Sequence, residues 1–400
     1  MFPMSRQRQQ LPPQIKKVEV LDRSTGKPVV RYRVKVDVGA NPVDGKRQQA
    51  KRHCRTEADA RRVLAELQGK AQAGTYVSPS KITVEEVCAN YLGGRHNLRA
   101  SSLAKFEYDL APLRERHGEL PVQKLTKKHI DQLVTDLVAG GTKTAKGRTR
   151  RPWSPVAVNK TISSIDQVLA DALIQKIVTT NVAASVARVS AAHKDVDTFT
   201  AAEVQRLRKH FATNRLGHAW ELALYGLRRG EIAGLRWADI NFTAKTLLVA
   251  NNRVSAGGVT VENDPKSEAS RRELPLPDRL ARVLKAAKKR LAAERLAIGE
   301  HYGTGDYVVC NEAGEPYNPA VLSRYWANAV KAAGVRHIKL HGGRHTAATL
   351  MHLDGVPVAV IAAWIGHSDP TLTLRVYAHS QADALKSAGA ALDRPNKSSV

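Results

Sequence analysis

The sequence predicts a multidomain α+β protein: a small three-stranded sheet with one helix, then an all-helical region, then a mixed, mainly helical region. The first observation is the length of 400 residues, which suits two or three domains. The second is the alternation of apolar and polar residues over 30–37, typical of a strand with one buried face. The third is a series of helix-start signals that recurs from Thr83 onward.

The composition indicates a folded protein with a polyanionic partner. Apolar residues make up 42% of the chain, and 63 Lys and Arg against 37 Asp and Glu give a net charge of +26. This excess favours nucleic acid, and less readily an anionic membrane surface. The longest apolar stretch, 356–366, is too short to span a membrane, and the polar, proline-containing N-terminus has no signal-peptide core. We therefore expect a cytoplasmic protein with no membrane partner.

The three cysteines, Cys54, Cys88 and Cys310, are far apart in the sequence. Their number and spacing exclude a disulfide framework and a CxxC zinc site. We expect three buried, reduced thiols.

Residues 1–80 predict a three-stranded sheet with one helix. Strands are expected at 17–21, around 30–37 and at 48–54, and Thr56 with Asp59 resembles the capping box of a following helix. The region holds 17 Lys and Arg against 7 Asp and Glu. The polar face of the middle strand is a solvated surface or a DNA contact, and the charge favours DNA. Its basic residues are Arg31, Arg33 and Lys35.

Residues 81–180 predict helices only. Helices are expected to start at Thr83, at Ser101 or Ser102, at Thr126, and at Ser154 followed by Pro155. The segment between the last two helices is either a solvated loop or a contact to a phosphate backbone. Its five cations are Lys143, Lys146, Arg148, Arg150 and Arg151.

Residues 181–197 are rich in Ala, Ser and Val with little pattern, which predicts an interdomain linker. Residues 198–400 open with a third capping box, Thr200 with Glu203. They continue as two helices, strands around 247–254 and 272–276, and further helices.

This last region contains a series of short motifs in a fixed order. They are YGLRRGEI at 225–232, PKS at 265–267, RRELPLP at 271–277, LHGGRHT at 340–346, IGHS at 365–368 and RVYAH at 375–379. Each motif alone has an ordinary structural explanation. Arg228 alone is a basic residue at a helix start, and Tyr377 alone is a core tyrosine.

Taken together, these motifs resemble those of the tyrosine recombinase family, specifically the phage-type, heterobivalent integrases similar to lambda integrase. The resemblance covers about residues 80–390 through the ordered series Arg, Lys, His-x-x-Arg, His and Tyr. It implies a catalytic domain of the DNA breaking-rejoining type at 198–400 and a helical, SAM-like core-binding domain at 81–180. For residues 1–80 a weaker likeness implies an arm-type DNA-binding domain.

The resemblance also implies a role for each motif residue. Tyr377 is the expected nucleophile, which forms a 3′-phosphotyrosyl link and releases a 5′-hydroxyl. Arg228 and Arg344 grip the non-bridging phosphate oxygens, as permanently charged guanidinium groups do well. Lys266 is the expected acid for the departing oxygen, although Lys245 is an alternative. His341 is expected to accept the tyrosine proton or to hold the phosphate, and His367 to donate a hydrogen bond to the scissile phosphate. Glu231 is expected to orient Arg228. Arg271 and Arg272 are expected to contact the DNA backbone or to face solvent.

At the level of the whole protein, the resemblance implies a metal- and ATP-independent DNA strand transferase without a cofactor. It implies a homotetramer on double-stranded DNA with core and arm-type sites, which integrates or excises a mobile element through a Holliday junction. A host DNA-bending protein and an excision directionality factor are possible further partners, and the expected location is the nucleoid of a bacterial cell. The tail after Tyr377 is expected to be helical and to pack on its own domain or on a neighbouring subunit.

Two other functions remain in view. A type IB topoisomerase shares the nucleophile chemistry but acts as a monomer, and the arm-like first region argues against it. A catalytically silent architectural DNA-binding protein is the second, and the intact set of six motif residues argues against it.

Overall fold

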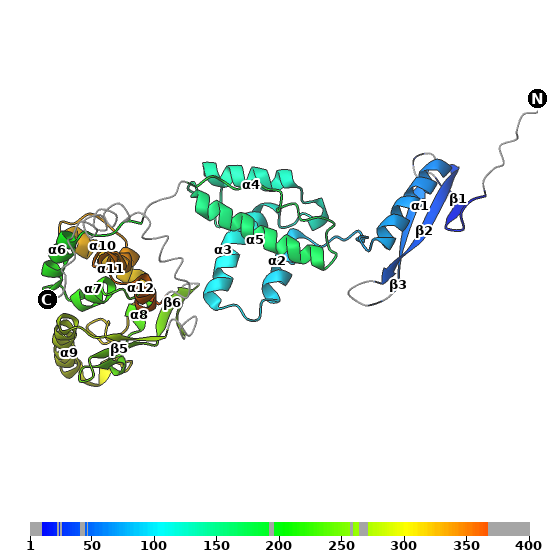
Figure 1. Ribbon diagram of the computed structural model, residues 1–400. Coiled ribbons are helices and arrows are strands. Elements are labelled where there is room, and N and C mark those ends of the chain that lie inside the picture. The colour runs from blue at the N-terminus through cyan, green and yellow to red at the C-terminus, as the bar shows by residue number, and fades with distance from the viewer. Residues whose placement is uncertain are drawn as a thin grey trace, which may run out of the picture. The chain divides into compact units, whose positions relative to one another are not determined.

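The computed structural model describes residues 10–21, 24, 26–40, 45, 47–191, 196–256, 259–263 and 271–366. The chain divides into two compact units, Met1–Ala191 and Ala192–Val400. Figure 1 shows a small sheet with one helix and a set of helices in the first unit, and mixed helices and strands in the second.

The first part of the N-terminal unit is an antiparallel sheet with one helix packed on it. The strand order is β1-β2-β3, with β1 at Ile15–Leu21, β2 at Pro28–Ala40 and β3 at Arg47–Cys54. Helix α1 (Glu57–Gln72) begins after Thr56, whose side chain accepts a hydrogen bond from the Asp59 amide. Alternate residues of β2, Val34 and Val36, are buried against α1 because a strand presents every second side chain to one face.

The second part of this unit is helical. Its helices are α2 (Val84–Gly93), α3 (Ala100–His117), α4 (Lys127–Ala139) and α5 (Pro155–Ile174). Thr83, Thr126 and Ser154 cap α2, α4 and α5 with their side chains, as the sequence predicts. The predicted start of α3 at Ser101 or Ser102 is wrong. Arg99 is the N-cap and makes no side-chain capping bond.

The predicted linker at 181–197 is wrong for its first half. Ala183 and Val186 are buried in the hydrophobic core of the helical part. The Asn181 side chain donates hydrogen bonds to the backbone and carboxylate oxygens of Asp166. Small apolar residues without periodicity look like a linker in sequence, but here they cover the end of the helical core.

In the described part of the C-terminal unit, helices pack around a main hydrophobic core beside two small sheets, and α11 and α12 share a smaller apolar cluster. Thr200 and Glu203 form the predicted capping box at its first helix. One sheet has the order β4-β5-β8 and the other pairs β6 with β7. The elements are α6 (Ala201–Phe211), α7 (Gly217–Leu224), α8 (Arg229–Gly234), β4 (Ile240–Asn241), β5 (Thr246–Val249), β6 (Asn252–Ala256), β7 (Val259–Asn263), β8 (Arg272–Pro275), α9 (Asp278–Ile298), α10 (Pro319–Ala332), α11 (Leu340–Leu353) and α12 (Val358–Ile365).

The core of this unit is aromatic at its centre. The Trp220 and Trp326 rings meet edge to face with centroids 5.6 Å apart, and Phe199 packs beside Trp326. This core holds α7, α10 and α11 together, which fixes the loop after α7 and the first turn of α11.

The three cysteines are buried and form no disulfide, as the sequence predicts. Among the helices of the described ranges, none is both long and apolar enough to cross a membrane.

Candidate active site

Arg228 lies at the N-terminal end of α8, directly after the tight turn that follows α7. Its Nη1 donates to Glu231 Oε1 at 2.7 Å, and its backbone amide donates to Glu231 Oε2 at 2.8 Å. Its Nη2 donates to the carbonyl of Gly366 at 2.5 Å. The side chain is 32% exposed, so the guanidinium is anchored on one side and open to solvent on the other.

Arg344 is anchored to the same turn. It lies in α11 and is 1% exposed, and its Nη1 donates to the carbonyl of Gly226 at 2.7 Å. Gly226 has φ +98°, a backbone conformation that residues other than glycine rarely adopt. The glycine of the YGLRRGEI motif therefore allows one short turn to carry Arg228 and to hold Arg344.

His341 lies in the first turn of α11, three residues before Arg344. It is exposed, and its ring meets the ring of His345 edge to face with centroids 4.7 Å apart. Burial of His345, together with the charge of Arg344, lowers the pKa of His345. A neutral His345 then supports the His341 ring without adding a charge.

Arg228 and His341 open into one cleft of about 730 Å³. Four further basic residues, which the sequence motifs did not predict as site residues, also line this cleft: Arg229, Arg253, His337 and Lys339. Among the described residues that line it, none is acidic. The cleft is lined by Arg228, Arg229, Gly230, Asn252, Arg253, Val254, Ser323, His337, Lys339, Leu340 and His341.

The sequence held partial signals for these additional cations. Arg229 follows Arg228 directly, and Lys339 lies two residues before His341. Arg253 and His337 have no motif around them, so only the fold brings them to the cleft. Gly230 allows this approach, because a Cβ there would lie 2.7 Å from the Arg253 carbonyl. The result is a concave, cationic site suited to a phosphate group.

The predicted DNA or solvent contact of Arg272 is wrong. Its side chain is 8% exposed, and its Nη1 and Nη2 donate to the two carboxylate oxygens of Glu231, each at 3.1 Å. Burial alone would raise the pKa of Glu231, but the hydrogen bonds and charges of Arg272 and Arg228 outweigh it and lower that pKa. A buried arginine and an exposed one look alike in a sequence. By contrast, Arg271 is exposed, and its DNA contact stays a prediction.

Three motif residues, Lys266, His367 and Tyr377, lie outside the described residues, as does the tail that follows Tyr377. Strand β7 ends at Asn263 and β8 begins at Arg272, so Lys266 lies between two strands along the chain. Within the described ranges, no group of His, Cys, Asp or Glu side chains is arranged to hold a metal ion.

Comparison with known proteins concerns the same part of the chain. The model of the phage integrase family matches residues 197–383. This part of the chain belongs to the phage integrase family.

The same comparison gives relatives for the integrase-family domain. Over 198 residues the chain is 31% identical to a tyrosine recombinase XerC-like protein of Caldanaerobacter subterraneus subsp. tengcongensis. That match covers 46% of this chain and 51% of the relative, so the chain spans about half the length of that curated relative.

Two solved structures have a similar fold over more of the chain. The Tn1549 transposon integrase, in complex with transposon right end DNA, has a TM-score of 0.63 at 18% identity and covers 78% of this chain and 100% of that chain. A lambda integrase tetramer bound to a Holliday junction has a TM-score of 0.54 at 17% identity and covers 92% of this chain and 96% of that chain. These likenesses confirm the predicted fold class.

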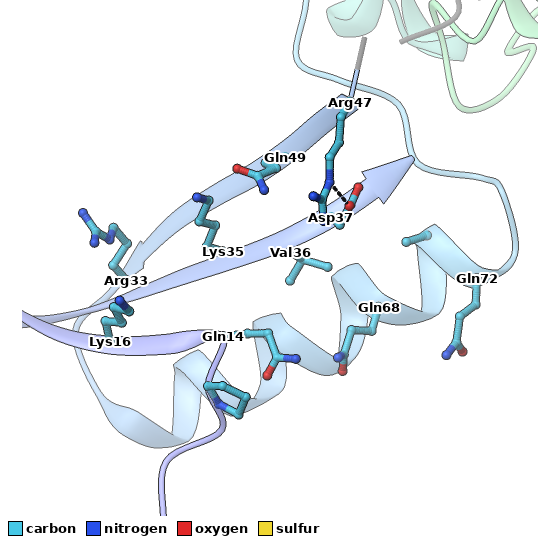
Figure 2. A pocket seen from close by; sticks show the side chains of 12 residues that line it. Gln14, Lys16, Arg33, Lys35, Val36, Asp37, Arg47, Gln49, Gln68 and Gln72 are labelled. Carbon is cyan, nitrogen blue, oxygen red and sulfur yellow. Dashed lines mark hydrogen bonds and ion pairs between the residues drawn. The ribbon is translucent and has the colours of Figure 1, made fainter. Parts of the chain in front are cut away.

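Outside the integrase-family domain, the N-terminal sheet carries a basic face. Arg33 and Lys35 are exposed, and Figure 2 shows them on the side of β2 opposite Val36, which points toward α1. In the sheet register Arg33 lies between Lys16 and His53, and Lys35 lies opposite Lys51. Residues of β1, β2, β3 and α1 line a hollow of about 580 Å³ at this sheet.

Rows of like charge across neighbouring strands destabilise a sheet. A face that places Lys35 opposite Lys51 does not stabilise the sheet, whereas an anionic partner bound there would neutralise the repulsion. We call the residues Lys16, Arg31, Arg33, Lys35, Lys51 and His53 the outer sheet face.

The basic loop at 143–151 is only partly available to DNA. Arg150 forms an ion pair with Glu115, and its side chain is 10% exposed, so it fastens the loop to α3. Lys143 donates to the Thr149 hydroxyl across the loop at 2.7 Å. Lys146, Arg148 and Arg151 are exposed, and their contact with DNA stays a prediction.

Proposed function

We propose that this protein is a site-specific tyrosine recombinase that cleaves and rejoins DNA through a 3′-phosphotyrosyl intermediate on Tyr377. The observation that carries the proposal is the cationic cleft of about 730 Å³, in which Arg228 and His341 meet while Arg344 is held by the turn that carries Arg228. The family match over residues 197–383 supports the same chemistry.

The reaction requires little covalent chemistry from the protein apart from the nucleophile. Tyr377 Oη bonds to the scissile phosphorus while the bond from phosphorus to the 5′ oxygen breaks. The tyrosine proton passes to His341 or to water, and Lys266 gives a proton to the departing 5′ oxygen. Arg228, Arg344 and His367 hold the non-bridging oxygens, on which negative charge is concentrated in the transition state.

Rejoining is the reverse reaction on a new strand. A 5′-hydroxyl attacks the phosphotyrosyl phosphorus and the tyrosine leaves. One phosphodiester is exchanged for another at each step, so the cycle needs no ATP. The cationic side chains supply the charge stabilisation that a metal ion supplies in other phosphoryl-transfer enzymes, so we propose a metal-independent reaction without a cofactor.

We further propose that the protein works as a homotetramer on DNA and acts on a phage or another mobile element within the bacterial nucleoid. The similar lambda integrase structure is a tetramer bound to a Holliday junction, and the similar Tn1549 protein is the integrase of a transposon. The outer sheet face is the proposed contact to a second, arm-type site. The proposal includes an arm-type domain at 1–80, a core-binding domain that begins at 81 and extends past 180 to include Ala183 and Val186, and a catalytic domain at 198–400. A host DNA-bending protein and an excision directionality factor are proposed additional partners.

Trapping the covalent intermediate tests the proposal. Duplexes bound by the protein are selected from a random-sequence pool, and a nick is placed near the cleavage position so that the released strand diffuses away. The wild-type protein is expected to form a covalent adduct, while Tyr377→Phe binds the same duplex and forms none. A wild-type protein that binds but never forms an adduct would be an architectural DNA-binding protein.

The topoisomerase alternative is separated by a different readout. Relaxation of supercoiled plasmid without a selected site, by protein at low concentration, is the behaviour of a monomeric topoisomerase. We expect strand exchange between two selected sites instead, with a rate that rises steeply with protein concentration because four subunits assemble.

A further inference from the structure

Arg272 is the first residue of β8, and its side chain donates hydrogen bonds to two different elements, α8 and α12. Two go to the carboxylate of Glu231, and its Nε donates to the carbonyl of Trp364 at 2.7 Å. The side chain is 8% exposed, so it lies largely out of solvent.

The first consequence concerns the charge of Arg228. Glu231 is 5% exposed, and a buried carboxylate is costly unless it is paired. Paired with Arg228 alone, it would cancel the charge that Arg228 brings to the cleft. Because Arg272 shares the carboxylate, the group of three side chains keeps one net positive charge, and Glu231 still fixes the orientation of Arg228.

The second consequence concerns the C-terminal end of α12. The last carbonyls of a helix lack partners inside the helix and carry its negative dipole end. Here Arg272 donates to the Trp364 carbonyl and Arg228 donates to the Gly366 carbonyl. The peptide group of that Gly366 carbonyl joins Gly366 to His367 in the chain.

A further bond ties this end to the turn that carries Arg228. Trp364 Nε1 donates to the Tyr225 carbonyl at 2.8 Å. The end of α12 is thus held by Arg272, by Arg228 and by the backbone of the turn. Arg272 and Arg228 therefore share Glu231 and both bind carbonyls at the end of α12.

We propose that Arg272 is a positioning residue for DNA cleavage, which leaves a net positive charge on the group around Arg228, keeps Arg228 oriented and fixes the end of α12. This inference rests on the proposed recombinase function. In the alternative, Arg272 only neutralises a buried carboxylate, and its loss affects stability without affecting the cleavage step.

The first test is Arg272→Lys in the full-length chain. Lysine keeps the positive charge but cannot donate to both carboxylate oxygens and to the Trp364 carbonyl in a planar fork. On the nicked duplex we expect an affinity within about twofold of wild type and adduct formation at saturating protein slowed at least about tenfold. Arg295→Lys, at an exposed position of α9, is the matched control and should behave as wild type.

Three results would overturn the inference. One is an unchanged cleavage rate with a lowered unfolding temperature, which indicates a purely structural role. Another is an equal loss of affinity and rate, which indicates a DNA contact. The third is a wild-type protein that forms no adduct, which overturns the proposed function itself. This failure is distinguished from a failure of the inference about Arg272 because it is seen without any variant.

A second pair of variants keeps the test valid if Arg272→Lys does not fold. Glu231→Gln removes the buried charge, and Glu231→Gln with Arg272→Met removes both groups without leaving a carboxylate unpaired. We expect the double variant to cleave at least about fivefold more slowly than Glu231→Gln alone, because the Trp364 carbonyl loses its donor. Equal rates for the two would overturn the role at α12.

Discussion

Arg344 Nη1 donates a hydrogen bond to the carbonyl of Gly226 at 2.7 Å, although 118 residues separate the two in the sequence. Gly226 belongs to the turn that carries Arg228, so this bond couples the two arginines proposed to hold the scissile phosphate. The geometry of the candidate site therefore depends on one short turn between α7 and α8.

Gly226→Ala tests this dependence. With φ +98° an alanine is strained, and we expect a loss of about 1–2 kcal/mol in the free energy of unfolding. Its Cβ would only touch Trp364 and Ile365 at 3.5 Å, so the fold should persist while the shifted Arg344 anchor slows adduct formation.

The control is Gly334→Ala, also at positive φ and with open space around it. Denaturant unfolding and adduct kinetics are measured for both. A comparable loss of stability with normal cleavage is expected for Gly334→Ala. The same cleavage rate in both variants would show that the Gly226 turn does not position Arg344.

The charge of Glu231 should appear in the pH dependence of stability. The arginines lower its pKa in the folded state, so the unfolded chain binds the proton first as the solution is acidified. The stabilisation is present above the ordinary glutamate pKa of about 4.3 and is lost as the pH falls through the lower, folded value.

Glu231→Gln should therefore lower the free energy of unfolding by about 3 kcal/mol at neutral pH. The difference in this free energy between the variant and the wild type should become smaller below about pH 4. Urea unfolding at a series of pH values measures this. Glu273→Gln, at an exposed position of β8, is the control. A gap that stays constant down to pH 3 would contradict the prediction.

His218 supplies a second pH dependence, in a milder range. It is 3% exposed, and its Nε2 donates to the Val308 carbonyl at 2.9 Å. Burial, together with the charge of Arg290, lowers the pKa of His218 to about 4. The unfolded chain binds a proton below about pH 6.5 while the folded chain does not, so stability falls as the pH drops from about 6.5 to about 4.

His218→Gln keeps a donor for Val308 but has no titrating group. Between pH 7 and pH 5 the free energy of unfolding of the wild type should fall by about 2 kcal/mol more than that of this variant. His301→Gln, at an exposed position, serves as the control. Parallel curves for wild type and His218→Gln would contradict the prediction, because they would mean that His218 has the same pKa in the folded and the unfolded chain.

The outer sheet face should determine the salt dependence of arm-site binding. Arg33→Gln with Lys35→Gln removes two exposed cations. Because each phosphate contact contributes about one to the slope of log affinity against log salt, we expect that slope to fall by about two.

Binding is measured on a duplex that the wild-type protein binds through its N-terminal region. Arg62→Gln, whose side chain is 78% exposed on α1, removes a cation from the same domain and should leave the slope unchanged. An unchanged slope for the double variant would exclude this face as the interface.

The local features of this protein could be predicted from its sequence because their causes are local. Period-two alternation indicates a strand wherever it occurs, and Thr83 and Thr126 cap their helices through bonds to residues three positions away. The ordered motifs around Arg228 and His341 likewise indicated the integrase family before any contact was known.

The sequence could not determine which of two residues of the same type is buried and which is exposed. Arg271 and Arg272 are neighbours of the same type, yet one is exposed and the other is paired with Glu231, 41 residues away. Ala183 and Val186 lack periodicity and still belong to a core. Such outcomes depend on contacts between distant segments.

The sequence by itself therefore determined the fold class, most of the predicted helix starts, the excess of positive charge and the set of motif residues. Only the tertiary structure decided that Arg253 and His337 join the cleft, and that the Arg272 side chain is buried against Glu231. The physical reason is that burial and charge pairing are properties of positions in space. A linear pattern records the spacing of residues but not which distant side chain will neutralise a given carboxylate.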